Sequence, residues 1–223
     1  MRGSCYTFAV IAFLTSPAVA ETPLERGRYL VEGIAACGTC HARPGQESAD
    51  IPGDLAGGIR FRLRGYSSFA ANITPDRTTG IGAWNEAAIV RAIRQGRRPD
   101  GSRIGAMPFE LYRQLSDGDA FAIATYLLSL KPVENSVPRT GRGRVRPTSP
   151  ARSTATVVPE PPRNDPVQYG RYLAGPAGRC MECHTPSGAD DRPDYKNMLG
   201  AGGVTFTGPW GQAISGNITP DPD

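Results

Sequence analysis

The chain has 223 residues, and its 25 Lys and Arg against 21 Asp and Glu give a formal net charge of +4. So small a positive excess does not indicate a nucleic-acid-binding protein. Apolar residues make up 39% of the chain, enough for a packed core, while 27 Gly and 21 Pro predict short helices joined by turn-rich connections. No convincing pair of β-strands is visible, so an all-α fold is predicted.

The first 20 residues have the pattern of a secretory signal peptide. Arg2 supplies positive charge, residues 6–14 form an apolar run, and Ala-Val-Ala at 18–20 is a typical cleavage site. We therefore predict cleavage after Ala20 and a periplasmic protein. The apolar run is short for a bilayer span, and an uncleaved anchor is the alternative interpretation. Membrane association is otherwise expected only through a partner, since no later stretch approaches 18 apolar residues.

Three helices are predicted next, over residues 22–34, 85–96 and 116–131. Each follows a polar N-cap and stops at a glycine, a proline or a turn. In the first, Thr22 is the N-cap and Glu25 is placed to close a capping box. A short helical turn is expected just before the third helix.

Four cysteines remain after the signal peptide, and all lie in Cys-x-x-Cys pairs that are each followed by one of the only two histidines. The two sets are Cys37, Cys40 and His41, and Cys180, Cys183 and His184. Cysteines three apart on a helical turn lie on one face, so both can bond to one edge of a porphyrin while the next imidazole binds its iron. We therefore predict covalently bound haem c, up to two per chain.

The second iron ligand of the first haem is predicted to be Met107. No histidine is left over and lysine is scarce, while this methionine lies beside a proline in a loop between two predicted helices. Filling a gap in the core is the alternative role. Met198 follows His184 by 14 residues and has no counterpart near His41, so a packing or surface role is expected. The second haem is thus expected to lack a sixth ligand from this chain.

The two motifs belong to an internal repeat, since His41 and His184 are 143 residues apart and neighbouring segments match as well. The matching segments are 22–25 and 165–168, 27–30 and 170–173, and Asn-Ile-Thr-Pro-Asp at 72–76 and 217–221. Matches in one order indicate a duplicated domain, with Asp165 and Gln168 in the helix-start positions of the second copy.

A zinc site, a redox dithiol and a disulfide are the other interpretations of the two motifs. A zinc ion would need four ligands in one place, and the position of the motifs in separate copies argues against one ion shared between them.

The predicted domain organisation follows from the repeat. Residues 1–20 are the signal peptide, 21–133 a complete domain, 134–163 a linker rich in Pro and Arg, and 164–223 a partial domain without the last helices and the distal methionine. A solvated tether is the favoured interpretation of the linker, and a docking strip for an acidic partner or anionic membrane is the alternative.

Several of these segments resemble the class I c-type cytochromes. They are the two Cys-x-x-Cys-His motifs, the Asn-Ile-Thr-Pro-Asp segments, residues 80–84, Met-Pro-Phe at 107–109 and the helix from 115 to 127. The chain is most similar to multihaem cytochrome c subunits of periplasmic alcohol- and aldehyde-type dehydrogenases. The resemblance implies an all-helical fold with crossed first and last helices, Gly27 allowing close approach to Tyr126. It also implies His41 as proximal and Met107 as distal ligand; Trp84 would lie near the haem or in the core.

The leading hypothesis is an electron carrier in a periplasmic respiratory chain. It would accept electrons from a dehydrogenase and pass them to an oxidase or another cytochrome, with no catalytic residues of its own. One alternative is a dihaem enzyme, such as a peroxidase or a sulfur-compound oxidoreductase, that uses the open second haem. Another is a gas-sensing haem module.

Overall fold

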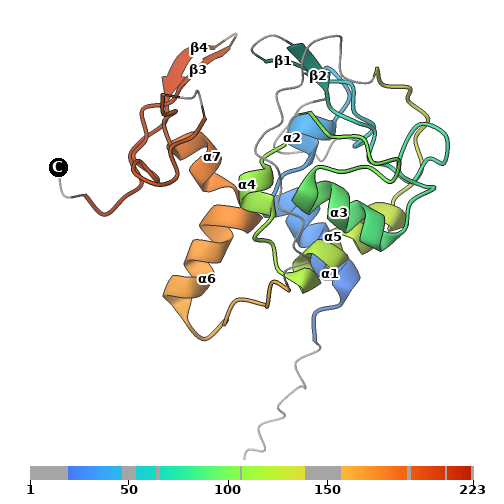
Figure 1. The fold of residues 1–223 in the computed structure, drawn as a ribbon, viewed down its shortest axis with the longest axis horizontal. Helices are drawn as coiled ribbons and strands as arrows, with labels where there is room; N and C mark the ends of the chain where they lie inside the picture. Colours follow the sequence, from blue (N-terminus) through green and yellow to red (C-terminus); the bar gives the residue numbers. More distant parts are fainter. Residues whose placement is uncertain are drawn as a thin grey trace, which may run out of the picture.

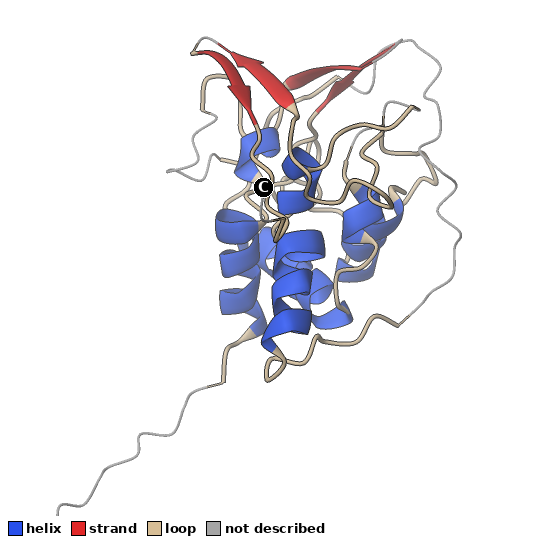
Figure 2. Ribbon diagram, turned by 90° about the vertical axis from the view of Figure 1, so that its left-hand side faces the viewer, coloured by secondary structure: helices blue, strands red, loops and turns tan. Residues whose placement is uncertain are grey.

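A computed structural model describes residues 20–46, 54–63, 66–105, 107–138, 157–189, 192–208 and 210–221. Nearly all of the predicted signal peptide and the middle of the predicted linker therefore lie outside the described residues. Figure 1 shows a helical first unit, coloured blue to yellow, with the orange and red second unit against one side of it. Figure 2 shows the helices gathered at one end and the short strands at the other. Within the part of the chain described here, no helix is long and apolar enough to cross a membrane.

The N-terminal helix begins with the predicted capping box. Helix α1 (Pro23–Arg28) has Thr22 as its N-cap, whose side chain accepts a hydrogen bond from the backbone N–H of Glu25 while the Glu25 carboxylate accepts one from the backbone of Thr22. The chain continues into a turn of π-helix, η1 (Tyr29–Ile34). The capping box satisfies the first N–H groups of the helix and fixes where it starts.

Helices α3 (Glu86–Gln95), α4 (Phe109–Tyr112) and α5 (Asp117–Ser129) also belong to the first unit. The predicted caps Asn85 and Ser116 each accept a hydrogen bond from a backbone N–H of their helix. Gly96 ends α3 with a φ of 62°, a left-handed conformation that glycine adopts without strain. The predicted helices and the short turn before the last one are confirmed.

Helices α1 and α5 cross in close contact, as the resemblance to cytochromes implied. A Cβ atom placed on Gly27 would lie 2.1 Å from the carbonyl oxygen of Ala122 and 2.6 Å from Cβ of Tyr126. Only glycine therefore fits at this crossing. The core behind it consists of buried side chains from both helices and their neighbours, including Leu30, Val31, Leu115, Ile123 and Leu127.

The second unit starts in the same way as the first. Helix α6 (Pro166–Tyr172) continues into a π-helical turn, η2 (Leu173–Ala177), and then into α7 (Cys180–His184). Asp165 is the N-cap and accepts from two backbone N–H groups. The capping box expected with Gln168 takes a different form, because the Gln168 side-chain amide donates to the Asp165 carboxylate at 2.7 Å.

The expectation of no strand pair was wrong. Strands β1 (Arg60–Leu63) and β2 (Tyr66–Phe69) form an antiparallel hairpin, and β3 (Thr205–Gly208) and β4 (Gly211–Ile214) form another. Each strand has only four residues. An alternation of apolar and polar residues cannot be recognised over so short a stretch, particularly one that contains arginine or glycine. The two hairpins occupy corresponding places in the repeat.

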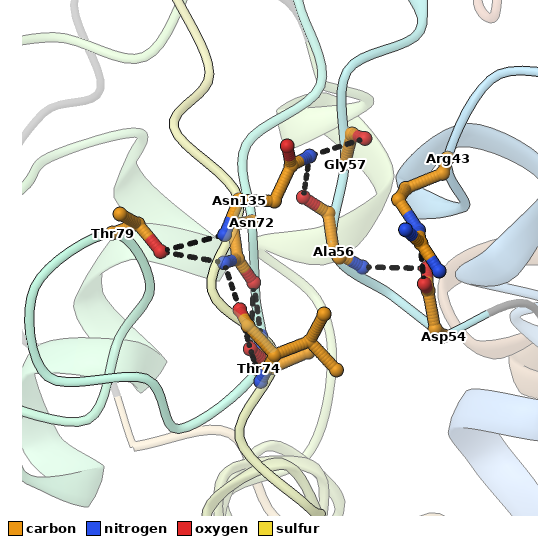
Figure 3. Close-up of polar contacts among 9 residues, drawn as sticks. Arg43, Asp54, Ala56, Gly57, Asn72, Thr74, Thr79 and Asn135 are labelled. Carbon is orange, nitrogen blue, oxygen red and sulfur yellow. Dashed lines mark hydrogen bonds and ion pairs between the residues drawn. The ribbon is translucent and has the colours of Figure 1, made fainter.

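The ends of the predicted linker are bonded to the first unit. The backbone N–H of Asn135 donates to the Thr79 hydroxyl at 3.0 Å, and the Asn135 side chain donates to the carbonyl oxygen of Ala56 at 2.9 Å (Figure 3). At the far end, the carbonyl oxygen of Val158 accepts from the backbone N–H of Asp117 at 2.9 Å. These ends are therefore not a freely solvated tether, because they are held against the domain that precedes them.

Candidate haem sites

The first Cys-x-x-Cys-His motif forms a single helical turn. Helix α2 (Gly38–His41) follows Ala36, whose φ of 43° turns the chain sharply out of the π-helix. The thiols of Cys37 and Cys40 and the imidazole of His41 are half-buried. The fold thus presents two thiols and one imidazole from one turn, as attachment to a single porphyrin edge requires.

His41 is oriented by a backbone hydrogen bond. Its Nδ1 lies 2.8 Å from the carbonyl oxygen of Ala71, which can only accept, so Nδ1 carries the proton and Nε2 keeps a free lone pair. Burial, with a smaller contribution from the charge of Arg179, lowers the pKa of His41. The imidazole is therefore neutral at pH 7, which is the form that binds a metal.

The second motif repeats this geometry. Nδ1 of His184 lies 2.8 Å from the carbonyl oxygen of Gly216, which corresponds to Ala71 in the repeat. The carbonyl oxygen of each histidine accepts from a glycine N–H, at 2.7 Å from Gly57 in the first unit and 2.8 Å from Gly202 in the second. The two imidazoles are therefore oriented by the same backbone bonds, although Cys180 and Cys183 are more exposed than their counterparts.

The described residues contain no preassembled zinc site. Among the residues that the structure describes, no group of three His, Cys, Asp or Glu side chains is arranged to hold a metal ion. Burial raises the pKa of Cys37 to about 11, so the free thiol is protonated at neutral pH. The four cysteines of the two motifs are also free of disulfides.

The predicted distal ligand, Met107, packs against the core of the first unit. Met107 is half-buried and packs against the hydrophobic cluster that Cys37 also contacts, and its carbonyl oxygen accepts from the backbone N–H of Phe109 at 2.8 Å. Trp84 packs against the same cluster. Met198 is 44% exposed, in keeping with the surface role expected of it. Paired thiols, a free imidazole nitrogen and a half-buried thioether together form a donor set that fits haem c.

Sequence patterns did not indicate the residues that join the two units. The Tyr172 hydroxyl, on α6, reaches Asp119 and Ser116 on the first unit. The Arg179 side chain, at the start of the second motif, reaches the backbone of Ala35. The one available signal was the alignment of Tyr172 with Tyr29 in the repeat, but nothing local indicated that only the second of these tyrosines would be buried.

Comparison with known proteins identifies the class. Residues 22–127 match the family model described as cytochrome C oxidase, cbb3-type, subunit III. The first unit is therefore a cytochrome c domain, a member of a mainly helical class of domains that bind haem for electron transfer.

Relatives extend the similarity over most of the chain. The fructose dehydrogenase cytochrome subunit of Gluconobacter japonicus is 34% identical over 77% of this chain, and the cytochrome c subunit of a quinone alcohol dehydrogenase from Gluconacetobacter polyoxogenes is 30% identical over 90%. A diheme cytochrome c-type protein of Cereibacter sphaeroides is 29% identical over 82%. The chain spans 36%, 45% and 63% of the lengths of these three relatives, respectively.

Proposed function

We propose that this chain is a periplasmic electron carrier with two covalently attached haems, which accepts electrons from a dehydrogenase and is not itself an enzyme. The observation that carries the proposal is the recurrence of one histidine geometry. In both motifs the imidazole Nδ1 is bonded to a backbone carbonyl at 2.8 Å, which leaves Nε2 free beside two thiols. Such an orientation suits an iron ligand and has no use in a disulfide or a redox dithiol.

In the first domain, Cys37 and Cys40 would form the thioether bonds and His41 would bind the iron from one side. Met107 would bind it from the other side, held by its packing against the core. When bound, the haem supplies an iron that gains and loses single electrons. A sixth position filled by a thioether leaves no room for a substrate at the iron, so this site favours electron transfer over catalysis.

In the second unit, Cys180 and Cys183 would hold a second haem with His184 as its iron ligand. We infer that this unit arose by duplication, and the recurring hairpin, π-helical turn and histidine bonds support that origin. Met198 has no counterpart near His41 in the first unit, so we do not assign it as the sixth ligand. We propose that its sixth position is completed by water or by a partner.

The names of the relatives support the choice of partner. Two of them are cytochrome subunits, one of a fructose dehydrogenase and one of a quinone alcohol dehydrogenase. We propose that a dehydrogenase donates electrons to this chain and that an oxidase or another cytochrome accepts them. Export through the signal peptide, with cleavage after Ala20, would bring the chain to the periplasm.

Haem content tests the proposal. The protein is produced in a periplasm that contains a c-type cytochrome maturation system, and haem per chain is measured as the pyridine haemochrome after extraction of any unattached haem. Two haems are expected in the wild type. Cys37→Ser with Cys40→Ser should leave one, and Cys180→Ser with Cys183→Ser should also leave one. A colourless wild-type protein would contradict the proposal.

A further inference from the structure

Arg179 lies at the junction between the two candidate haem sites. It directly precedes Cys180, and its φ of 54° repeats the left-handed turn that Ala36 makes before Cys37. Alanine in that position has no functional group, whereas the arginine side chain extends from the second unit and is only 16% exposed. The same backbone turn thus carries a buried cation in one copy alone.

The contacts of this cation come from both units. Nη2 of Arg179 donates to the carbonyl oxygen of Ala35 at 3.1 Å, two residues before the first motif. The guanidinium carbon lies 5.9 Å from the centre of the Tyr112 ring, also in the first unit. Nη1 donates to the Glu182 carboxylate at 3.0 Å, inside the second motif. Arg179 therefore bridges the segments that lead into the two sets of cysteines.

The charge of Arg179 lies between the segments that carry the two sets of ligands, because its Nη2 reaches the carbonyl oxygen of Ala35 and its Nη1 reaches the Glu182 carboxylate. A guanidinium stays protonated at any ordinary pH, so this charge is permanent.

Neutralisation of this charge is incomplete. The Glu182 side chain is 38% exposed, so solvent screens its charge more than that of the arginine. Nε of Arg179 is buried and has no hydrogen-bond partner among the residues that the structure describes. A net positive field therefore remains between the two motifs.

We propose that Arg179 is a positioning residue that holds the two haem sites against each other and raises the reduction potential of both haems with one shared charge. This inference rests on the proposed function. A ferric site carries one positive charge more than a ferrous site, so a nearby cation favours the ferrous form. Because Arg179 contacts both units, its effect should not be confined to the haem of its own unit.

Redox titration followed by optical spectra tests the inference on the holoprotein. In Arg179→Gln the midpoint potentials of both haems should fall. In Arg179→Lys, which keeps the positive charge, both potentials should stay close to those of the wild type. Glu182→Gln should raise both potentials, because the arginine loses its counter-charge. This opposite sign separates an electrostatic role from a merely structural one, and Glu182→Gln still tests the inference if Arg179→Gln does not fold.

The matched control is Arg171→Gln, which removes the same charge from an exposed position on α6 and should leave both potentials unchanged. A shift confined to the second haem in Arg179→Gln, or a fall of the potentials in Glu182→Gln, would overturn the inference. These outcomes are distinct from failure of the proposed function, which would appear earlier as a wild-type protein without attached haem.

Discussion

The Tyr172 hydroxyl, from the second unit, donates a hydrogen bond of 2.6 Å to the Asp119 carboxylate of the first. That carboxylate is buried and also accepts two hydrogen bonds from Arg26, at 2.7 and 2.8 Å. Helix α6 of the second unit thus completes a buried ion pair that joins α1 to α5 of the first. The two units are therefore coupled through the same helix crossing that forms the cytochrome c domain.

Loss of this hydroxyl should weaken the whole chain. Tyr172→Phe leaves the carboxylate with one donor fewer in a buried place, and we expect the free energy of unfolding to fall by about 1–3 kcal/mol. Tyr29→Phe is the matched control, since Tyr29 occupies the same position in the first repeat but is 44% exposed. Its effect should stay within about 0.5 kcal/mol. Urea unfolding of the two variants measures the difference, and equal effects would contradict the role given to Tyr172.

A second pair of matched variants tests the crossing of α1 and α5. In Gly27→Ala the new methyl would collide with the Ala122 carbonyl, and overpacking of this kind costs about 1–3 kcal/mol. In Gly170→Ala, at the corresponding position of α6, the methyl meets nothing within 4 Å. That change should be neutral or should stabilise the protein by up to about 1 kcal/mol, because alanine favours a helix. If Gly27→Ala unfolded at a higher temperature than Gly170→Ala, the close contact of α1 with α5 would be contradicted.

Sequence patterns predicted those parts of the structure whose cause is local. The caps Thr22, Asn85 and Ser116 stand next to the helices that they begin, so short-range patterns were enough to predict them. The close approach at Gly27 came from a family resemblance and is confirmed. The predicted axial role of Met107 stays a prediction.

Other features were missed because they depend on tertiary contacts. The hydrogen bond of Tyr172 spans 53 residues and that of Arg179 spans 144. The two partners of each hydrogen bond are too far apart in the sequence for a local pattern to connect them. The repeat did not help either, because Tyr29 is exposed while Tyr172, at the same position of the second copy, is buried. The hairpins were missed for a different reason, since four-residue strands are too short to show a periodic pattern.

Stability at alkaline pH should depend on Tyr126. Burial, helped by a hydrogen bond to Glu32, raises the pKa of Tyr126 from 10 to about 12. The folded protein therefore holds this proton more tightly than the unfolded chain, so the associated stability is complete below pH 10 and is lost as the pH rises towards 12. Tyr126→Phe should flatten, though not abolish, the fall in unfolding free energy across this window, because burial also raises the pKa of Tyr112. A variant curve parallel to that of the wild type would exclude the contribution.

The axial role of Met107 has a direct spectroscopic test. The oxidised holoprotein should show the weak red absorption band of a sulfur-to-iron bond, and Met107→Ala should abolish the band and lower the potential of one haem. Met198→Ala is the control and should change neither, since Met198 is exposed at the surface. A band that persists in Met107→Ala and disappears in Met198→Ala would reverse the assignment.

If each of the two motifs attaches one porphyrin to the exported chain, the intact mass of the mature protein will show it. We expect the mass of the chain cleaved after Ala20 plus two covalently bound haems, with one haem lost in each double cysteine variant. A mature polypeptide with no added porphyrin mass, obtained from cells that make other c-type cytochromes normally, would rule out haem attachment at both motifs.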